Sequence, residues 1–272
     1  MHGMKRFSLV LVCVLYMSGT LEAHTLLVGV KGWGASSNSI VGQLVEEDIA
    51  NATPLSTAET DKGTGFLIGP VIGFQPDNSP WSFSTALMLF GRFTQKIDMY
   101  IPELIPPIDE TADQELSRLD LDFAVSRAFG PYFKLYGGYK YQYFDSKVSS
   151  GLFILNTKIR VHIPTIGAGV AYPLGRKLFT SAQAGIIYAI SDSDEDTKPT
   201  FGFNVEGGIS YLLSDSLIMQ AGFRYQLYSI RFADSSTYEK ESYQDTFSGF
   251  TLALVYMFRN FSIQPASFTD EL

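Results

Sequence analysis

The chain has 272 residues, enough for one large domain or two small ones. Charged residues make up only 18% of it, below the roughly 25% usual in soluble domains, whereas aromatic residues make up 14%. The formal net charge of −8 and the pI of about 4.9 argue against a nucleic-acid-binding protein.

The first 23 residues have the three-part pattern of a secretory signal peptide. Lys5 and Arg6 precede an apolar run over residues 7–17, and small and polar residues follow up to Ala23. The run is too short to cross a bilayer as a helix. We therefore expect cleavage after Ala23, which removes the single cysteine, Cys13, and leaves a mature chain without disulfides.

Ten later segments alternate apolar and polar residues with a period of two, which is typical of β-strands. In FKLYGGYKYQY, which begins at Phe133, Leu135 and Tyr139 lie on the apolar side, and Lys134 and Lys140 lie on the other. Most segments have about the ten residues that a tilted strand needs to cross a membrane. The strands are expected at residues 25–35, 63–75, 81–95, 116–128, 132–145, 159–172, 177–190, 200–212, 216–231 and 246–258.

The connections between these segments alternate in length. Long connections, such as 36–62 and 96–115, alternate with tight turns, such as PLGRK at 173–177 and LSDS at 213–216. This order is typical of an up-and-down meander with turns at one rim and loops at the other. Because an open sheet edge leaves unpaired backbone groups in hydrocarbon, at several kcal/mol each, we expect the strands to close into a barrel. An even number of strands places both termini on the turn side, which is the periplasm if export precedes insertion.

Alternation alone does not decide whether the apolar faces meet a protein core or lipid. Three observations favour lipid: the polar faces carry few charges, the long connections are acidic, and aromatic residues lie near the ends of the apolar faces. The expected aromatic girdle consists of Trp81, Phe93, Phe133, Tyr143, Tyr172, Tyr188, Phe201, Tyr211, Tyr256 and Phe258. The sequence therefore predicts an all-β, transmembrane, up-and-down antiparallel β-barrel of about ten strands.

The final strand, FSGFTLALVYMF, carries Phe250, Leu252, Leu254, Tyr256 and Phe258 on one face and ends on an aromatic residue. It resembles the terminal insertion signal of bacterial outer-membrane β-barrels, the superfamily that includes outer-membrane protein A-type and small porin-like barrels. The resemblance implies a bacterial outer-membrane location after signal-peptide cleavage, insertion by the barrel-assembly machinery, and contact with outer-membrane lipid and lipopolysaccharide. The barrel would cover residues 24–258, and a short periplasmic tail would cover 259–272.

The faces turned away from lipid carry charges of both signs, which inside a barrel must be paired or hydrated. Two interpretations stay open: an ion-pair network that fills the lumen, or a narrow basic constriction that selects anions. A ten-stranded barrel is only slightly wider than the eight-stranded barrels that side chains fill. The expected lumen charges are Lys31, Arg92, Arg118, Asp120, Asp122, Lys134, Lys140, Glu206 and Arg224.

These features predict a structural or narrow-pore protein with acidic surface loops, and the alternative is a surface enzyme or an adhesin. Some ten-stranded outer-membrane barrels that this layout resembles are rim proteases with acidic residues and a histidine. His162 is a weak catalytic candidate, with Asp120 and Asp122 two strands away, but its parity places it on the lipid side. We therefore expect no enzyme.

The sequence has no phosphate-binding loop, dinucleotide fingerprint or zinc spacing, so we expect no cofactor and no structural metal. The acidic connections, such as the one that holds Asp192 and Asp194, have two interpretations. They are either solvated surface loops or weak Ca²⁺ or Mg²⁺ sites, because both ions prefer oxygen ligands.

Overall fold

The computed structural model describes residues 24–38, 43, 46–47, 57–102, 107–149, 154–192, 197–232 and 242–261. Among them, ten long antiparallel strands close into a barrel, which confirms the predicted fold class. The expected signal peptide at 1–23, the tail beyond residue 261 and the acidic residues 193–196 lie outside the described residues. The barrel strands are β1 (His24–Asn38), β3 (Gly63–Pro76), β4 (Trp81–Ile101), β5 (Ile108–Phe129), β6 (Phe133–Ser149), β7 (Ile154–Pro173), β8 (Leu178–Asp192), β10 (Thr200–Leu212), β11 (Leu217–Phe232) and β12 (Ser242–Phe261).

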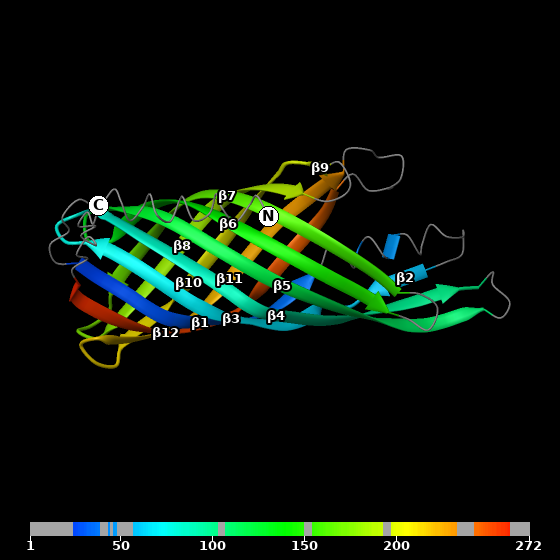
Figure 1. The fold of residues 1–272 in the computed structure, drawn as a ribbon, viewed down its shortest axis with the longest axis horizontal. Helices are drawn as coiled ribbons and strands as arrows, with labels where there is room; N and C mark the ends of the chain where they lie inside the picture. Colours follow the sequence, from blue (N-terminus) through cyan, green and yellow to red (C-terminus); the bar gives the residue numbers. More distant parts are fainter. Residues whose placement is uncertain are drawn as a thin grey trace, which may run out of the picture.

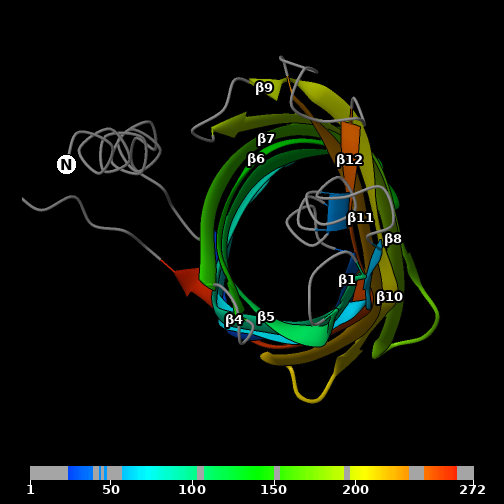
Figure 2. The same cartoon turned by 90° about the vertical axis from the view of Figure 1, so that its right-hand side faces the viewer.

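The first strand pairs with the last, so the sheet closes on itself. β1 runs antiparallel to β12 from His24, opposite Phe261, to Asn38, opposite Thr246. β10 pairs with both β8 and β11, which completes the ring seen end-on in Figure 2. Closure lets the backbone N–H and C=O groups of the barrel strands pair within the sheet, as a hydrocarbon environment requires.

Tight turns join the strands at one end of the barrel, the turn side, and longer connections join them at the other, the loop side (Figure 1). The turns lie at 77–80, 130–132, 174–177 and 213–216. In the second of these, Gly130 has φ of 75°, a left-handed conformation that glycine adopts at little cost. His24 and Phe261 also lie on the turn side, because β1 and β12 pair there.

The predicted loop at 96–115 is wrong for most of its length. β4 continues to Ile101 and β5 begins at Ile108, and these two residues pair opposite each other. The alternation persists here, because Ile97 is fully buried whereas Asp98 on the same strand is exposed. The charged outer positions resemble a loop in the sequence, but they are the solvated face of a hairpin that reaches beyond the rest of the barrel (Figure 1).

Two short strands add to the loop side. β2 (Thr57–Thr60) pairs with the outer part of β4, and β9 (Thr197–Lys198) pairs with the end of β11. Together with β2, the paired residues 91–101 of β4 and 108–118 of β5 form what we call the β4–β5 extension. Its inward residues Ile97, Met99 and Ala112 pack with Val148 of β6 in a small apolar cluster of their own.

The outer surface divides into an apolar band and a polar zone on its loop side. On β5 the outward residues are apolar from Val125 to Leu119 and polar from Ser117 onward. Phe201 is 73% exposed and Phe250 77% exposed, and such contiguous apolar exposure suits lipid rather than water. Since β5 has 22 residues and a tilted strand crosses lipid with about ten, roughly half of this strand projects beyond the membrane.

Most of the predicted girdle lies on this outer surface. Its turn-side members are at strand ends next to the tight turns, and its loop-side members are near the edge of the apolar band. The girdle residues that face outward are Trp81, Phe133, Tyr143, Tyr172, Tyr188, Phe201, Tyr211, Tyr256 and Phe258. Among the described residues, no helix is both long and apolar enough to cross a bilayer.

A β-bulge in β4 overturns two predictions. The pairing with β5 shifts between Met88 and Gly91, and a bulge inserts an extra residue, so the inward and outward faces exchange. Met88 points inward before the shift, whereas Phe93 is buried after it, at 1% exposure, and Arg92 is exposed. Arg92 is therefore not a lumen charge and Phe93 is not a girdle residue. A prediction that assumes strict alternation from Trp81 onward cannot include this shift.

Candidate functional site

Along the barrel axis, an apolar layer of the interior lies on the loop side of a charged layer. Going down β5 from the loop side, the inward residues are Leu116, Arg118, Asp120, Asp122 and Ala124. Apolar, charged and small side chains thus follow one another along the barrel axis. The interior is the natural candidate site, because the outer wall meets lipid over much of its height.

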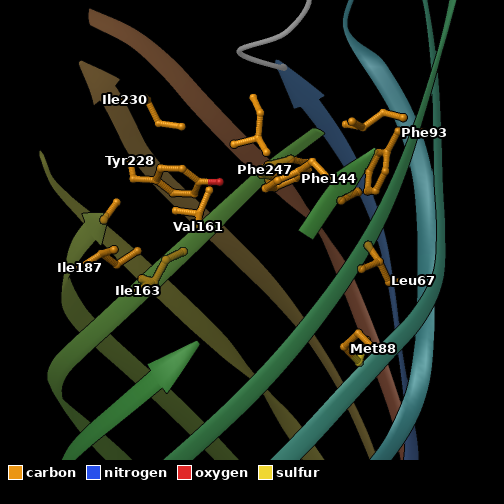
Figure 3. Close-up of a cluster of buried hydrophobic side chains, with 14 of the residues drawn as sticks. Leu67, Met88, Phe93, Phe144, Val161, Ile163, Ile187, Tyr228, Ile230 and Phe247 are labelled. Carbon is orange, nitrogen blue, oxygen red and sulfur yellow. The ribbon is translucent and has the colours of Figure 1, made fainter. Parts of the chain in front are cut away.

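Apolar side chains form a cluster on the loop side of Arg118, with the buried polar residues Gln95, Gln114 and Ser146 beyond it, and we call this cluster the apolar plug. Figure 3 shows its members pointing from the surrounding strands into one shared space. Within the described chain, every barrel strand except β10 contributes. The apolar plug consists of Trp33, Ala35, Leu67, Met88, Phe93, Leu116, Phe144, Ile159, Val161, Ile163, Ile187, Ala189, Tyr228, Ile230, Tyr243 and Phe247.

Phe247 is the centre of the apolar plug. Its ring stacks on Phe144 with centroids 6.1 Å apart, and it meets Phe93 edge-on at 5.6 Å and Trp33 at 6.1 Å. Phe247 lies on β12 and Phe144 on β6, which are opposite strands of the ring. Contact between them means that side chains span the lumen from one wall to the other at this level.

A buried ion pair lies directly on the turn-side surface of the apolar plug. The Arg118 guanidinium carbon is 3.9 Å from the ring centroid of Phe247, and it also lies over Trp33 and Phe144. Arg118 donates two hydrogen bonds to Asp120, Nε to Oδ1 at 2.6 Å and Nη2 to Oδ2 at 2.7 Å. Both side chains are almost fully buried, so aromatic faces and one carboxylate replace water around this charge.

Two glutamines continue the polar contacts across the lumen. Gln142 Nε2 donates to Asp120 Oδ2, Gln226 Nε2 donates to Gln142 Oε1, and Lys140 Nζ donates to Gln226 Oε1, each at 3.1 Å. We call this chain the glutamine bridge, since it joins β6 to β11. Sequence reasoning missed both glutamines. Their inward parity was available, but parity does not say which residues meet across a barrel.

The remaining predicted charges form a looser group nearer the turn side. Lys31 of β1 pairs with Glu206 of β10 at 2.6 Å, and Asp122 lies 3.2 Å from Lys140 Nζ and 3.6 Å from Arg224 Nη1. All predicted lumen charges except Arg92 therefore face the interior. Lys134 also faces inward and is half-buried, but it has no ion pair among the residues that the structure describes.

Two tyrosine–carboxylate contacts lie towards the loop-side end of the interior. Tyr228 donates to Asp245 Oδ2 at 2.6 Å, and Tyr243 donates to Glu47 Oε2. Glu47 belongs to the first long connection, and it is 6% exposed. The expectation that this connection is solvated is therefore wrong at Glu47. Asp245 was also missed, because the last strand begins four residues earlier than its predicted start at 246.

His162 lies on the outer wall, away from the interior carboxylates. Its Nδ1 hydrogen-bonds the Tyr139 hydroxyl, and its ring lies 5.3 Å from that of Tyr141, which is also outward. Asp120 is buried inside, so the barrel wall separates it from His162. Across the described ranges, no group of three or more His, Cys, Asp or Glu side chains is placed to hold a metal ion.

The closed antiparallel ring, its apolar outer band and its filled interior define a membrane β-barrel. The outer membrane protein beta-barrel domain matches residues 23–258, which is most of the chain. The chain therefore belongs to this family and is an outer-membrane β-barrel protein.

Comparison with solved structures lists outer-membrane proteins at low identity and with TM-scores below 0.5. Outer membrane protein OprG from Pseudomonas aeruginosa is 11% identical, with 89% of this chain and 98% of that chain covered and a TM-score of 0.33. The outer membrane protease OmpT from Escherichia coli is 11% identical, with coverage of 89% and 97% and a TM-score of 0.43. Neisserial surface protein A is 12% identical, with coverage of 86% and 97% and a TM-score of 0.32. No curated protein matches the chain.

Proposed function

We propose that this protein is a closed outer-membrane barrel with a structural and display role, rather than an open solute channel. The observation that carries the proposal is the stacking of Phe144 on Phe247, because these rings come from opposite strands. A hydrated ion would have to lose its water to pass an apolar constriction of this kind. The fully buried Arg118–Asp120 pair forms a second barrier directly below it.

Conductance in planar bilayers tests this proposal. Wild-type protein, folded in detergent and reconstituted, is expected to give no stepwise channel openings. The double variant Phe144→Ala and Phe247→Ala removes the rings that meet across the lumen and is expected to conduct. Phe250→Ala is the matched control, since it removes a lipid-facing ring from the same strand and is expected to stay silent.

Heat-modifiable gel migration establishes that each of these variants still forms a barrel. Steady single-channel openings of the wild-type protein would contradict the closed barrel and support the narrow-pore alternative. A silent double variant that retains the folded migration would contradict the assignment of the barrier to the contact between Phe144 and Phe247.

The proposal includes export and insertion. We propose that residues 1–23 are removed as a signal peptide, that the barrel-assembly machinery inserts the chain, and that the apolar band contacts outer-membrane lipid and lipopolysaccharide. The basic residues Lys5 and Arg6, the short apolar run and Ala23 support the cleavage site. N-terminal sequencing of protein purified from outer membranes is expected to begin at His24.

A second candidate function, adhesion, is favoured by the β4–β5 extension. This hairpin carries a polar outer face beyond the apolar band, where a partner at the cell surface would reach it. Replacing residues 96–113 by a two-residue turn is expected to leave the barrel folded and to abolish adherence of cells that display the protein. Unchanged adherence would remove this candidate.

A further inference from the structure

Positive charge is in excess in the turn-side half of the interior, below the glutamine bridge. The cationic side chains there are Lys31, Lys134, Lys140 and Arg224, and the carboxylates are Asp122 and Glu206. Arg118 and Asp120 neutralise each other above them. The cations of this group outnumber its carboxylates, so ion pairing within the described chain leaves positive charge uncompensated.

The cations compete for the two carboxylates. Asp122 serves both Lys140, at 3.2 Å, and Arg224, at 3.6 Å. Glu206 accepts from Lys31 at 2.6 Å and from Gln183 Nε2 at 3.5 Å, and it also attracts Lys134 electrostatically. Lys134 has no ion pair of its own among the described residues, so it is the cation with the least compensation.

Water reaches this part of the interior from the turn side. The inward-facing residues Ser84, Ser181 and Gln220 are exposed although they point away from lipid. The Lys31, Glu206 and Asp122 side chains keep 21%, 25% and 27% of their surface accessible, whereas the ion pair above them keeps almost none. The space is therefore hydrated at its turn-side end and closed at its loop-side end.

Small residues line the wall near these cations. Inward glycines lie on several of the surrounding strands, and tyrosine or lysine side chains pack flat against some of them. The Tyr136 hydroxyl would lie 2.4 Å from a Cβ at Gly185, and the Lys134 Cε would lie 2.9 Å from a Cβ at Gly169. The Lys134 stem therefore packs along the wall beside Gly169, which directs its ammonium group towards the other polar side chains of the interior.

We propose that the turn-side interior is a binding site for small oxyanions, centred on Lys134 and Lys31 beside Glu206. Ammonium groups on flexible stems bind phosphate and carboxylate oxygens as point charges. The amide of Gln183 and the hydroxyl of Ser181 lie on the same strand, β8, and supply neutral donors. A low-dielectric wall with one open end concentrates the field of the excess cations and favours anions over cations.

The Glu206 carboxylate competes with an incoming anion for Lys31 and Lys134. The direction in which Glu206→Gln changes anion affinity therefore tests the proposal. The carboxylate occupies Lys31 and attracts Lys134, so an incoming anion must displace it. Glu206→Gln keeps the shape of the side chain but removes the negative charge. It is expected to tighten anion binding, whereas a purely structural ion pair would respond with a loss of stability and no binding.

The test is calorimetric titration of the folded, detergent-solubilised protein with inorganic phosphate and, separately, with citrate, at low ionic strength. Wild-type protein is expected to bind at least one of them saturably, with affinity that falls as sodium chloride is added. Lys134→Met is expected to weaken binding about tenfold, the scale of one lost charge-assisted contact. Lys177→Met, in a tight turn outside the interior, is the control and is expected to bind as the wild type does.

Binding of phosphate alone assigns the site to phosphate groups, and binding of citrate alone assigns it to carboxylates. Absence of saturable binding of both anions by folded wild-type protein overturns the proposal, and so does a Glu206→Gln variant that binds no more tightly than wild type. The anion-site proposal goes beyond the closed-barrel proposal, and the two can be disproved independently. Phosphate binding by a barrel that conducts would overturn only the closed barrel, and a silent barrel without binding would overturn only the anion site.

Discussion

The loop-side and turn-side halves of the interior differ in the size of their side chains and in how far their charged groups are buried. At the loop side, large side chains from opposite strands meet, and the charge of Arg118 is enclosed by three aromatic rings and one carboxylate. At the turn side, the wall residues are small, and the Lys31, Glu206 and Asp122 side chains keep 21%, 25% and 27% of their surface exposed. The comparison shows that one barrel interior can hold a closely packed core in one half and partly exposed ion pairs in the other.

The comparison predicts that breaking an ion pair lowers the free energy of unfolding more in the loop-side half than in the turn-side half. This is the largest effect that we expect. Asp120→Ala leaves Arg118 buried without its counter-charge and is expected to lower the free energy of unfolding by about 3–5 kcal/mol. Glu206→Gln breaks a pair that water partly screens and is expected to cost about 1 kcal/mol or less. Urea unfolding in detergent, followed by tryptophan fluorescence, measures both. Equal costs would show that the halves do not differ.

A smaller effect concerns the shape of the turn-side wall. Gly185→Ala would bring a methyl group to 2.4 Å from the Tyr136 hydroxyl and 2.7 Å from Asn204 Oδ1. Such overpacking is expected to cost about 1–3 kcal/mol of unfolding free energy. The double variant with Tyr136→Phe is expected to recover much of this loss, because it removes the clashing oxygen. No recovery in the same urea experiment would mean that the backbone, not Tyr136, resists the methyl group.

The smallest effect is expected at the outer wall, at His162. His162→Ala removes contacts with Tyr139 and Tyr141 only, so the free energy of unfolding should fall by about 0.5–1.5 kcal/mol, the scale of one hydrogen bond. Because the barrel wall separates His162 from Asp120, fluorogenic peptides are expected to remain uncleaved by both wild type and variant. Cleavage by the wild type that disappears in His162→Ala would establish the rim-hydrolase alternative instead.

Much of this architecture is predictable from the sequence, because lipid on one side and a packed interior on the other impose strict alternation. The ten strands, the alternating connection lengths and the inward direction of Arg118, Asp120 and Glu206 all follow from a period of two. The bulge after Met88 does not follow, since an extra residue leaves no local mark in composition. Arg92 and Phe93 were therefore assigned to the wrong faces.

The contacts across the interior could not be predicted from the sequence for a different reason. Parity assigns Gln142 and Gln226 to the inner face, but their meeting depends on the tilt and stagger of strands that are far apart around the ring. The β4–β5 extension was missed because its outer face is solvated. Its exposed charged residues resemble those of a solvated loop. Only the buried residues Ile97 and Ala112, which alternate with them, indicate a strand.

The seam between β1 and β12 has a consequence for biogenesis. Its partners, such as Val30 and Leu254, are among the most distant pairs in the chain. Ring closure therefore requires that β12 has been made, and a product that stops short of β12 would present two unpaired strand edges to the bilayer. The joining of β1 to β12 is thus the pairing that turns an open sheet with two unpaired edges into a closed barrel.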